Sequence, residues 1–366
     1  MKTIVILIDQ LYRHGGIEKL VAIKANYWSE NFGYKVIIVS TEQLQNKPIY
    51  ELSEQVTFID IDIKYNRSLS FFHPKNFKKL FANLTALKEI IKLQTPDFIL
   101  VASHLPMTYV LPFLKTEAII IKEFHYSKFN TPTNRKEYLF SSIEKRYDYL
   151  VVLSEEEKTF YAASNVKVIP NPVTIAPRLE IPINKKENIA GALLRFAPVK
   201  QLEKMVGIWD LFAKRNNEWK LYIYGDIGNE YFEKIRILVT DKNLEKTIFF
   251  KGQTDNIVDA LSEMKLMLMT SANECFPLVI LEANSCGVPV ISFDSPTGPR
   301  NIIHHDVDGV IVPLNDVHAF ATALYQLSSD YNKLNRLSQA AVQNASHYHL
   351  DEIMQIWKEE IFENND

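Results

Sequence analysis

The chain has 366 residues, which is long for one ordinary hydrophobic core and fits two domains. Hydrophobic residues make up 47% and charged residues 23%, as is usual for a soluble globular enzyme. The formal net charge of -3 gives no reason to expect a nucleic acid as the partner. The two cysteines, Cys275 and Cys286, exclude a disulfide framework and a cysteine-ligated zinc site, and they favour a reducing, cytoplasmic location.

The first apolar run, from Met1 to Ile8, predicts a buried strand and not a signal peptide. Asp9 and Gln10 interrupt the run, and no cleavage site of small residues follows it. No other apolar run is long enough to span a bilayer, so contact with the inner membrane surface would be peripheral.

Short β-branched runs then alternate with helical patterns. The first unit has a strand at 3–8, a turn at Gly15-Gly16, a helix at 17–31 and a strand at 35–40. Continuous apolar strands separated by helices are typical of parallel sheets that are covered on both faces. Further strands of this kind are predicted at 56–61, 98–102, 118–123, 149–153 and 166–169.

A helical pattern between residues 77 and 92 carries an apolar stripe with lysines on both sides of it. Two interpretations are open: the buried face of a helix that covers a sheet, or a basic amphipathic helix that contacts an anionic membrane. The apolar residues are Phe77, Leu80, Phe81, Leu84, Leu87 and Ile91, and the lysines are Lys75, Lys78, Lys79, Lys88 and Lys92.

A stretch rich in proline and polar residues predicts a linker at 171–188. It separates an N-terminal domain at 1–170 from a C-terminal domain at 189–345, and a helix at 346–366 can pack back on the first domain. Ligands of such sheets bind beyond the carboxyl ends of the strands, so we expect the site in a cleft between the domains. Strands of the second domain are predicted at 189–194, 220–224, 248–251, 266–270, 288–293 and 309–312.

The most informative segment lies between Met267 and Pro313. A loop with Glu274 follows a strand, and Pro277 stands where a first helical residue is expected. The N–H groups and the positive dipole end at the start of a helix can hold a diphosphate. Glu282 stands about 7 Å further along the helix axis, where its carboxylate can accept both ribose hydroxyls of a nucleotide.

Glu274 and Glu282 have seven residues between them, in the context ECFPLVILEA followed by CGVPVI. This segment resembles the E-x7-E segment of family 4 retaining glycosyltransferases. The alternative interpretation is a surface helix with two solvated glutamates. The resemblance implies the α/β GT-B fold, with two Rossmann-like domains facing across a cleft, and the loop at 295–303 resembles one found in bacterial members that build surface polysaccharides.

The resemblance also implies a reaction. A hexose or N-acetylhexosamine would pass from a nucleotide sugar, UDP being the expected nucleotide, to a glycan or polyprenyl-linked acceptor. The transfer would be retaining and would need neither a metal nor another cofactor. Glu274 would face the sugar, and the donor would be bound by Phe276, Pro277, Leu278, Val279 and Glu282.

Arg195 and Lys200 are similar to the family's arginine and lysine that bind the donor diphosphate. Negative charge builds on the departing nucleoside diphosphate, and two fixed cations can stabilise it. The alternative interpretation is a pair of solvated surface cations. The family usually has glycine after this lysine, where the chain has Gln201.

Five more residues are candidates for the donor or acceptor site. The Gly15-Gly16 pair resembles the glycine loop of the first domain, where a backbone without Cβ can approach a phosphate or sugar. His125 corresponds to the histidine that faces the donor sugar, and His104 is a candidate for the acceptor side, although either histidine can be merely structural. Gln253 is expected near the base.

Two D-x-D sequences, at 60–62 and 306–308, spell the metal-binding pattern of a different transferase fold. We interpret both as solvated turns, because the resemblance implies a metal-independent reaction. Two other functions stay open: a nucleotide-sugar epimerase of the same fold, and a non-catalytic partner subunit.

Overall fold

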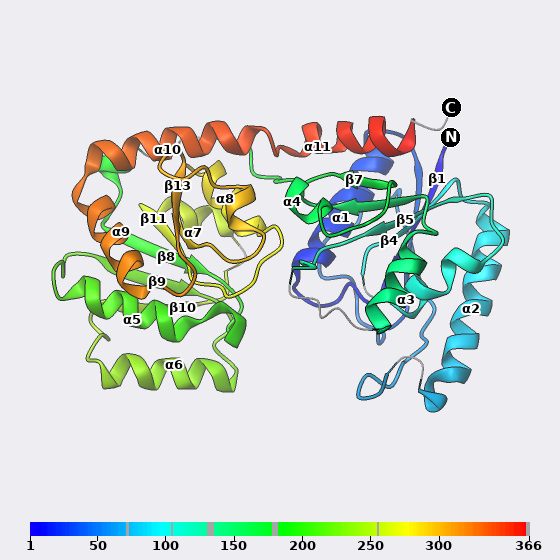
Figure 1. Ribbon diagram of the computed structural model, residues 1–366, viewed down its shortest axis with the longest axis horizontal. Helices are drawn as coiled ribbons and strands as arrows, with labels where there is room; N and C mark the ends of the chain where they lie inside the picture. Colours follow the sequence, from blue (N-terminus) through cyan, green and yellow to red (C-terminus); the bar gives the residue numbers. More distant parts are fainter. Residues whose placement is uncertain (71–72, 104, 130–134, 178–181, 255, 364–366) are drawn as a thin grey trace. The chain divides into compact units, whose positions relative to one another are not determined.

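The computed structural model describes the chain except residues 71–72, 104, 130–134, 178–181, 255 and 364–366 (Figure 1). The chain divides into two compact units. Unit 1 comprises Met1–Pro170 and Met354–Asp366, and unit 2 comprises Asn171–Ile353.

Unit 1 is built on a seven-stranded sheet in the order β3-β2-β1-β4-β5-β6-β7, with parallel neighbours throughout. Its strands are β1 (Thr3–Ile8), β2 (Lys35–Ser40), β3 (Thr57–Asp60), β4 (Phe98–Val101), β5 (Ile119–Glu123), β6 (Tyr149–Val152) and β7 (Val166–Val168). Its helices are α1 (Gly16–Glu30), α2 (Pro74–Gln94), α3 (Arg135–Glu144) and α4 (Glu155–Lys158), with short 3-10 turns at Pro106–Tyr109 and Leu111–Phe113.

Unit 2 has a six-stranded parallel sheet in the order β10-β9-β8-β11-β12-β13. Its strands are β8 (Ile189–Leu193), β9 (Lys220–Tyr224), β10 (Ile248–Gly252), β11 (Leu266–Met269), β12 (Val290–Phe293) and β13 (Gly309–Val312). Its helices are α5 (Leu202–Ala213), α6 (Glu230–Asp241), α7 (Ile257–Ser262), α8 (Leu278–Ser285), α9 (Val317–Ser329) and α10 (Tyr331–Ser346), with 3-10 turns at Ile183–Lys185, Pro198–Lys200 and Pro299–Asn301.

Helices cover the sheets (Figure 1). In unit 2, α5 packs on α6 and α9, while α8 packs on α7 and α10. Because both faces are covered, a central strand such as β4 is apolar along its whole length, and every residue of β1 is buried. The helix α11 (Leu350–Trp357) carries the chain from unit 2 back to unit 1, where a π-helical turn at Lys358–Phe362 follows.

The predicted fold class is confirmed: two α/β units, each with a parallel Rossmann-like sheet. Each predicted strand is present, with ends that differ by no more than two residues. Residues 171–188 belong to unit 2, where Ile183 is buried in the hydrophobic core. At the other end of unit 2, α10 continues to Ser346, and the return to unit 1 begins at Met354.

The strand order reverses beside the first strand of each unit, between β1 and β4 and between β8 and β11. At such a reversal the connections leave the sheet toward opposite faces, which opens a crevice at the carboxyl ends of the strands. The sheet topology alone therefore places a candidate ligand site in each unit.

Candidate active site

The candidate site residues of unit 2 gather at this reversal of strand order. Arg195 and Lys200 follow β8, and Glu274 follows β11. These two strands are hydrogen-bonded neighbours, so residues that leave their carboxyl ends are brought together although they lie far apart in sequence. Lys200 Nζ lies 2.5 Å from Glu274 Oε1, with side chains 22% and 14% exposed. Arg195 is exposed and makes no ion pair with any residue that the structure describes.

Lys200 is held in place by its own backbone. It ends the 3-10 turn at Pro198–Lys200, and the Thr270 hydroxyl donates to its carbonyl at 2.9 Å. The next residue, Gln201, has φ 49° and ψ 48°, in the left-handed region. Glycine reaches this region without steric cost, whereas a side chain costs energy there. The structure thus gives a physical reason for the glycine that the family usually has at this position.

The helix α8 starts one residue later than predicted. Pro277 has φ -71° and ψ 114°, so it precedes the helix as its N-cap, and Leu278 is the first helical residue. Glu282, in the second turn, is buried, with 6% of its surface exposed. A surface helix with two solvated glutamates would expose both side chains, and the structure shows neither carboxylate in that state.

The loop of Glu274 is fixed on three sides within unit 2. Its backbone pairs with the loop at 295–298, where Glu274 N donates to Pro296 O at 3.2 Å and Gly298 N donates to Glu274 O at 2.9 Å. Asn171 Nδ2 donates to Phe276 O at 3.2 Å, and the Phe276 ring lies 5.7 Å from that of Tyr348. A Glu carboxylate on such a loop has a defined position before any ligand arrives.

Gly298 permits this close pairing. A Cβ at this position would lie 2.8 Å from Pro277 Cδ and 3.0 Å from Glu274 Cβ, which is closer than real Cβ contacts. Any larger residue must therefore push the 274–277 loop away from the 295–298 loop.

The remaining donor-side candidate of unit 2 is Gln253. It is exposed and lies directly after β10, at the same carboxyl edge of the sheet as Arg195 and Glu274. In the described part of the chain, no hydrogen bond joins Gln253 to those two side chains. The base-binding role of Gln253 stays a prediction.

In unit 1, Gly15 is the N-cap of α1, and Gly16 is its first residue. The Glu18 carboxylate folds back over Gly15, so that a Cβ there would lie 2.1 Å from Glu18 Oε2. Burial raises the pKa of Glu18, and Gln10 Nε2 donates to its carboxylate. A carboxylate thus stands beside the glycine pair, a feature that the sequence did not reveal.

His125 follows β5 by two residues, and its side chain is 5% exposed. Its Nε2 lies 3.3 Å from Glu123 Oε2. The prediction for His104 falls on a residue outside the described part of the chain.

A buried lysine lies next to Glu123 on β5. Lys122 Nζ donates to Ser103 O at 2.9 Å and to Val101 O at 3.3 Å, which ties it to the carboxyl end of β4. Burial lowers the pKa of Lys122 to about 7, against the attraction of Glu123 and two other carboxylates. Lys122 is therefore a titratable group at the sheet edge where the unit 1 candidates lie.

The aspartates of the two D-x-D sequences make local contacts. Asp60 Oδ1 accepts from the Ser40 hydroxyl at 2.8 Å, and Asp62 forms an ion pair with Lys64 at 2.8 Å. Asp306 pairs with Lys333 at 2.8 Å, and Asp308 with His304 at 2.7 Å. The first sequence lies at the end of β3 and the second before β13, but the Asp308 side chain is only 2% exposed, so the prediction of a solvated turn is wrong for this residue.

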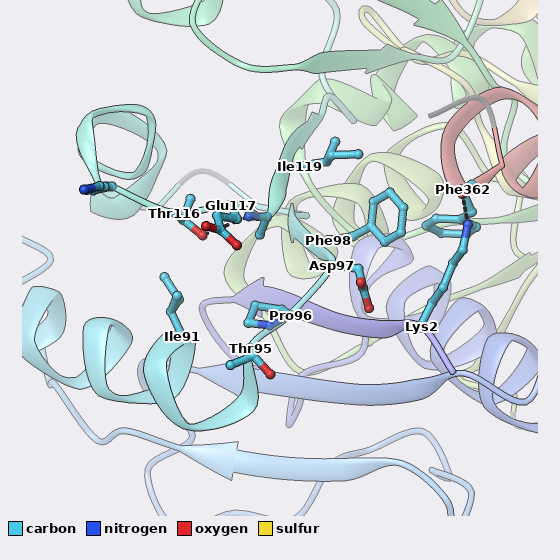
Figure 2. A pocket seen from close by; sticks show the side chains of 12 residues that line it. Lys2, Ile91, Thr95, Pro96, Asp97, Phe98, Thr116, Glu117, Ile119 and Phe362 are labelled. Carbon is cyan, nitrogen blue, oxygen red and sulfur yellow. Dashed lines mark hydrogen bonds between the residues drawn. The ribbon is translucent and has the colours of Figure 1, made fainter. Parts of the chain in front are cut away.

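A cavity of about 690 Å³ lies at the opposite edge of the unit 1 sheet (Figure 2). Its wall includes the start of β4 at Phe98, the start of β5 at Ile119, and Phe362 of the C-terminal segment. Asp97 Oδ2, at its edge, already accepts from Thr3 N at 2.6 Å. Since ligands of parallel α/β sheets bind at the carboxyl ends of the strands, this cavity is separate from the candidate active site.

The fold defines the class of protein. A structure of S. aureus TarM, in complex with Fondaparinux, alpha-GlcNAc-glycerol and UDP, superimposes with a TM-score of 0.79 over 98% of this chain and 99% of that one, at 17% identity. The chain is a GT-B protein. Residues 177–344 match the family model described as "Glycosyl transferases group 1". The chain thus carries a glycosyltransferase group 1 domain.

Curated relatives agree with this assignment. The amylovoran biosynthesis glycosyltransferase AmsD of Erwinia amylovora is 25% identical over 98% of this chain and 99% of its own length. The lipopolysaccharide 1,6-galactosyltransferase of Escherichia coli K12 is 26% identical over 72% of this chain and 74% of its own. The chain spans 23% of the length of another relative, the exopolysaccharide phosphotransferase SCO2592 of Streptomyces coelicolor, at 29% identity over 58% of this chain. Its relatives include glycosyltransferases of surface polysaccharide and lipopolysaccharide synthesis.

No helix in the described part of the chain has both the length and the apolar character needed to cross a bilayer.

Proposed function

We propose that the chain transfers a hexose or N-acetylhexosamine from a UDP-sugar donor to a glycan or polyprenyl-linked acceptor. The transfer retains the configuration at the anomeric carbon and needs no metal. The observation that carries the proposal is the Lys200–Glu274 pair at the β8–β11 reversal, beside the N-terminus of α8. The amylovoran biosynthesis glycosyltransferase, the lipopolysaccharide 1,6-galactosyltransferase and the TarM complex with UDP support the same choice.

Each residue has a task in this reaction. Arg195, Lys200 and the N–H groups of Leu278 and Val279 bind the diphosphate, and Glu282 binds the ribose. Glu274 binds hydroxyls of the sugar, and for His125, which follows β5 in unit 1, a role toward the donor sugar is proposed from the family resemblance alone. The bond between the anomeric carbon and the phosphate oxygen breaks, the acceptor oxygen bonds to that carbon on the same face, and its proton passes to the departing phosphate.

In this proposal, donor binding begins when the diphosphate breaks the Lys200–Glu274 ion pair. The diphosphate carries more charge than the carboxylate, so it competes for the Lys200 ammonium and leaves Glu274 free to accept hydrogen bonds from the sugar. Both side chains are partly buried in advance, so little reorganisation is needed when the donor arrives.

Activity of variants tests the site. Arg195→Ala and Glu274→Ala should each lower kcat/KM by about 100- to 1000-fold, as the loss of one charge-stabilising group does in other enzymes. Arg236→Ala is the matched control, because Arg236 is an exposed arginine of unit 2 that pairs with Glu233 one helical turn away. Unchanged activity of Arg195→Ala and Glu274→Ala would refute the assignment.

The donor is identified by thermal shift with a panel of nucleotide sugars, since a bound ligand raises the apparent stability of the folded state. Incubation of the donor without acceptor tests the epimerase alternative: an isomerised nucleotide sugar would favour the epimerase. EDTA should leave the transfer rate unchanged, and loss of activity with recovery by Mg²⁺ would refute metal independence.

We also propose peripheral contact with an anionic membrane through α2. The apolar stripe predicted for this helix is divided in the structure: Leu87 is buried, whereas Phe77 and Phe81 are 45% and 66% exposed. Lys75, Lys78, Lys88 and Lys92 are exposed on the same helix. Aromatic rings with surrounding lysines match the interface of an anionic bilayer. Salt-sensitive flotation with anionic liposomes, absent with neutral ones, is the expected result.

A further inference from the structure

The residue after Lys200 combines a strained backbone with a side chain that makes several hydrogen bonds. Gln201 lies in the left-handed region, with φ 49° and ψ 48°, where a residue with a Cβ loses energy that glycine does not lose. It is also the N-cap of α5, so it joins the turn at Pro198–Lys200 to that helix. The contacts of its side chain show what offsets the strain.

The amide of Gln201 contacts two loops of unit 2. The amide atom that faces Thr270 O and Asn315 Oδ1, at 3.1 Å from each, can only be the donor nitrogen, Nε2. The amide oxygen, Oε1, accepts from Lys204 Nζ at 3.2 Å. Thr270 directly follows β11, and Asn315 lies between β13 and α9. One side chain thus ties the turn of Lys200 to the loops that follow two other strands.

Further hydrogen bonds join the turn of Lys200 to the loop after β11. The hydroxyl of Thr270, a residue that is 1% exposed, donates to Lys200 O at 2.9 Å. Ala272 N donates to Val199 O at 2.8 Å. The Gln201 amide donates in the same direction as the turn, toward Thr270 O, so the two segments bond to each other from both sides.

The ion pair of the candidate site depends on this contact. Lys200 belongs to the turn, and Glu274 stands two residues beyond Ala272, so the contact sets the distance between the ammonium and the carboxylate. We propose that Gln201 is a positioning residue, whose amide holds Lys200 at the right distance from Glu274 to bind the diphosphate of the donor. This inference rests on the proposed function. A displacement of about 1 Å in a binding group can lower a rate about 100-fold.

Two substitutions separate the backbone strain from the hydrogen bonds of the amide. Gln201→Gly removes both, because glycine fits the left-handed backbone and has no side chain. Gln201→Glu keeps the size of the side chain but replaces the donor nitrogen by an acceptor, which the oxygens of Thr270 and Asn315 repel. If the amide is what positions Lys200, both variants must lose donor binding.

The first test measures UDP binding by calorimetry and transfer by kinetics. Gln201→Gly, Gln201→Ala and Gln201→Glu should all bind UDP about tenfold more weakly than wild type and lower kcat/KM by about 10- to 100-fold. Gln201→Gly should nevertheless unfold at a higher urea concentration than Gln201→Ala, so stability and binding should diverge. Normal UDP binding by Gln201→Gly, or binding that follows stability across the variants, would overturn the proposal.

Asn243→Gly is the matched control. Asn243 is another left-handed residue of unit 2, with φ 56°, and it lies between α6 and the amino end of β10. Its replacement by glycine should leave UDP binding and kcat unchanged.

The partner of the amide offers a conservative pair of variants. Asn315→Asp keeps an acceptor for Gln201 and for Lys204, and it should bind UDP like wild type. Asn315→Gly removes the acceptor, although its φ of 70° suits glycine, and it should bind UDP more weakly. The double variant Gln201→Gly/Asn315→Gly should lose no more than Gln201→Gly alone, because both changes remove the same hydrogen bond. Additive losses would contradict the network.

Hydrogen exchange gives a readout that needs no donor. Exchange at Ala272 N, which donates to Val199 O, should be at least about tenfold faster in Gln201→Gly than in wild type. Lys265 N donates to Ile189 O at 2.9 Å, between the amino ends of β11 and β8, and its exchange should not change. Unchanged exchange at Ala272 would refute the positioning role.

Failure of this inference and failure of the proposed function give different results. If Gln201→Gly and Gln201→Glu transfer sugar like wild type while Arg195→Ala abolishes transfer, the transferase assignment stands and the positioning role is refuted. If the wild type binds no nucleoside diphosphate, the proposed function fails, and hydrogen exchange still decides whether Gln201 holds the turn of Lys200.

Discussion

The pH dependence of stability should reveal the buried lysine of β5. Lys122 has a pKa of about 7 in the folded chain because of burial, against an ordinary value of 10.5. Between these two pH values the unfolded chain holds a proton at Lys122 that the folded chain has released. The free energy of unfolding must therefore rise with pH over this range. Below pH 7 both states are protonated, and the penalty for burying the charge is largest.

The magnitude follows from linkage. One proton of difference changes the free energy of unfolding by about 1.4 kcal/mol for each pH unit, and by about half as much close to the folded pKa. From pH 7 to pH 9 the wild type should gain about 2 kcal/mol that Lys122→Met does not gain. Loss of the hydrogen bonds to Ser103 O and Val101 O shifts the variant's stability at every pH, but it leaves this slope unaffected.

Urea unfolding at several pH values between 6 and 9 measures the effect. Trp209→Phe and Trp219→Phe in the background of both proteins leave Trp28 and Trp357, which report on unit 1. Lys88→Met, which removes an exposed lysine, is the control for general loss of charge. A constant difference between wild type and Lys122→Met from pH 6 to pH 9 would refute the low pKa and the reasoning behind it.

Three further changes test the site and the helix α2. Gly298→Ala should lower kcat/KM by at least tenfold while the fold is kept, because its Cβ displaces the loop of Glu274; normal kinetics would show that the 274–277 loop tolerates the displacement. Gln201→Gly should be more stable to urea than Gln201→Ala by about 1 kcal/mol, since both remove the side chain but only glycine fits the left-handed backbone; equal stability would contradict that conformation. The double variant Phe77→Ser/Phe81→Ser should lose flotation with anionic liposomes while keeping transfer to a soluble acceptor, and retained flotation would exclude α2 as the contact.

The strands could be predicted because burial on both faces leaves a strong signal in the sequence. Ile4, Val5 and Ile6 are each 0% exposed, so no polar residue interrupts the run that marks β1. The same reasoning placed Arg195, Lys200 and Glu274 at strand ends, which the reversal of strand order then brings to one edge. Their catalytic roles are proposals that the kinetics of variants will decide.

The buried ion pair between Lys24 and Glu123 could not be predicted. Lys24 stands in a helical pattern where a lysine normally indicates a solvated position, and its partner Glu123 lies 99 residues further along the chain. Their contact depends on how α1 packs against the end of β5, which no local pattern encodes. The helix α2 shows a similar limit, because helical spacing groups Phe81 with Leu87, and only the packing distinguishes the exposed ring from the buried side chain.

The chain enters unit 2 at Asn171 and leaves it at Ile353, so unit 1 is assembled from two pieces of the polypeptide. Phe362 packs its ring against Trp28 and Phe98, both from the first piece, at centroid distances of 5.1 and 5.0 Å. During synthesis, Trp28 and Phe98 are made before unit 2 and Phe362 after it, so their contact can form only when the whole of unit 2 has been made. Unit 2 can therefore finish folding first, and a premature stop codon near residue 350 would damage the part of the protein that was translated earliest.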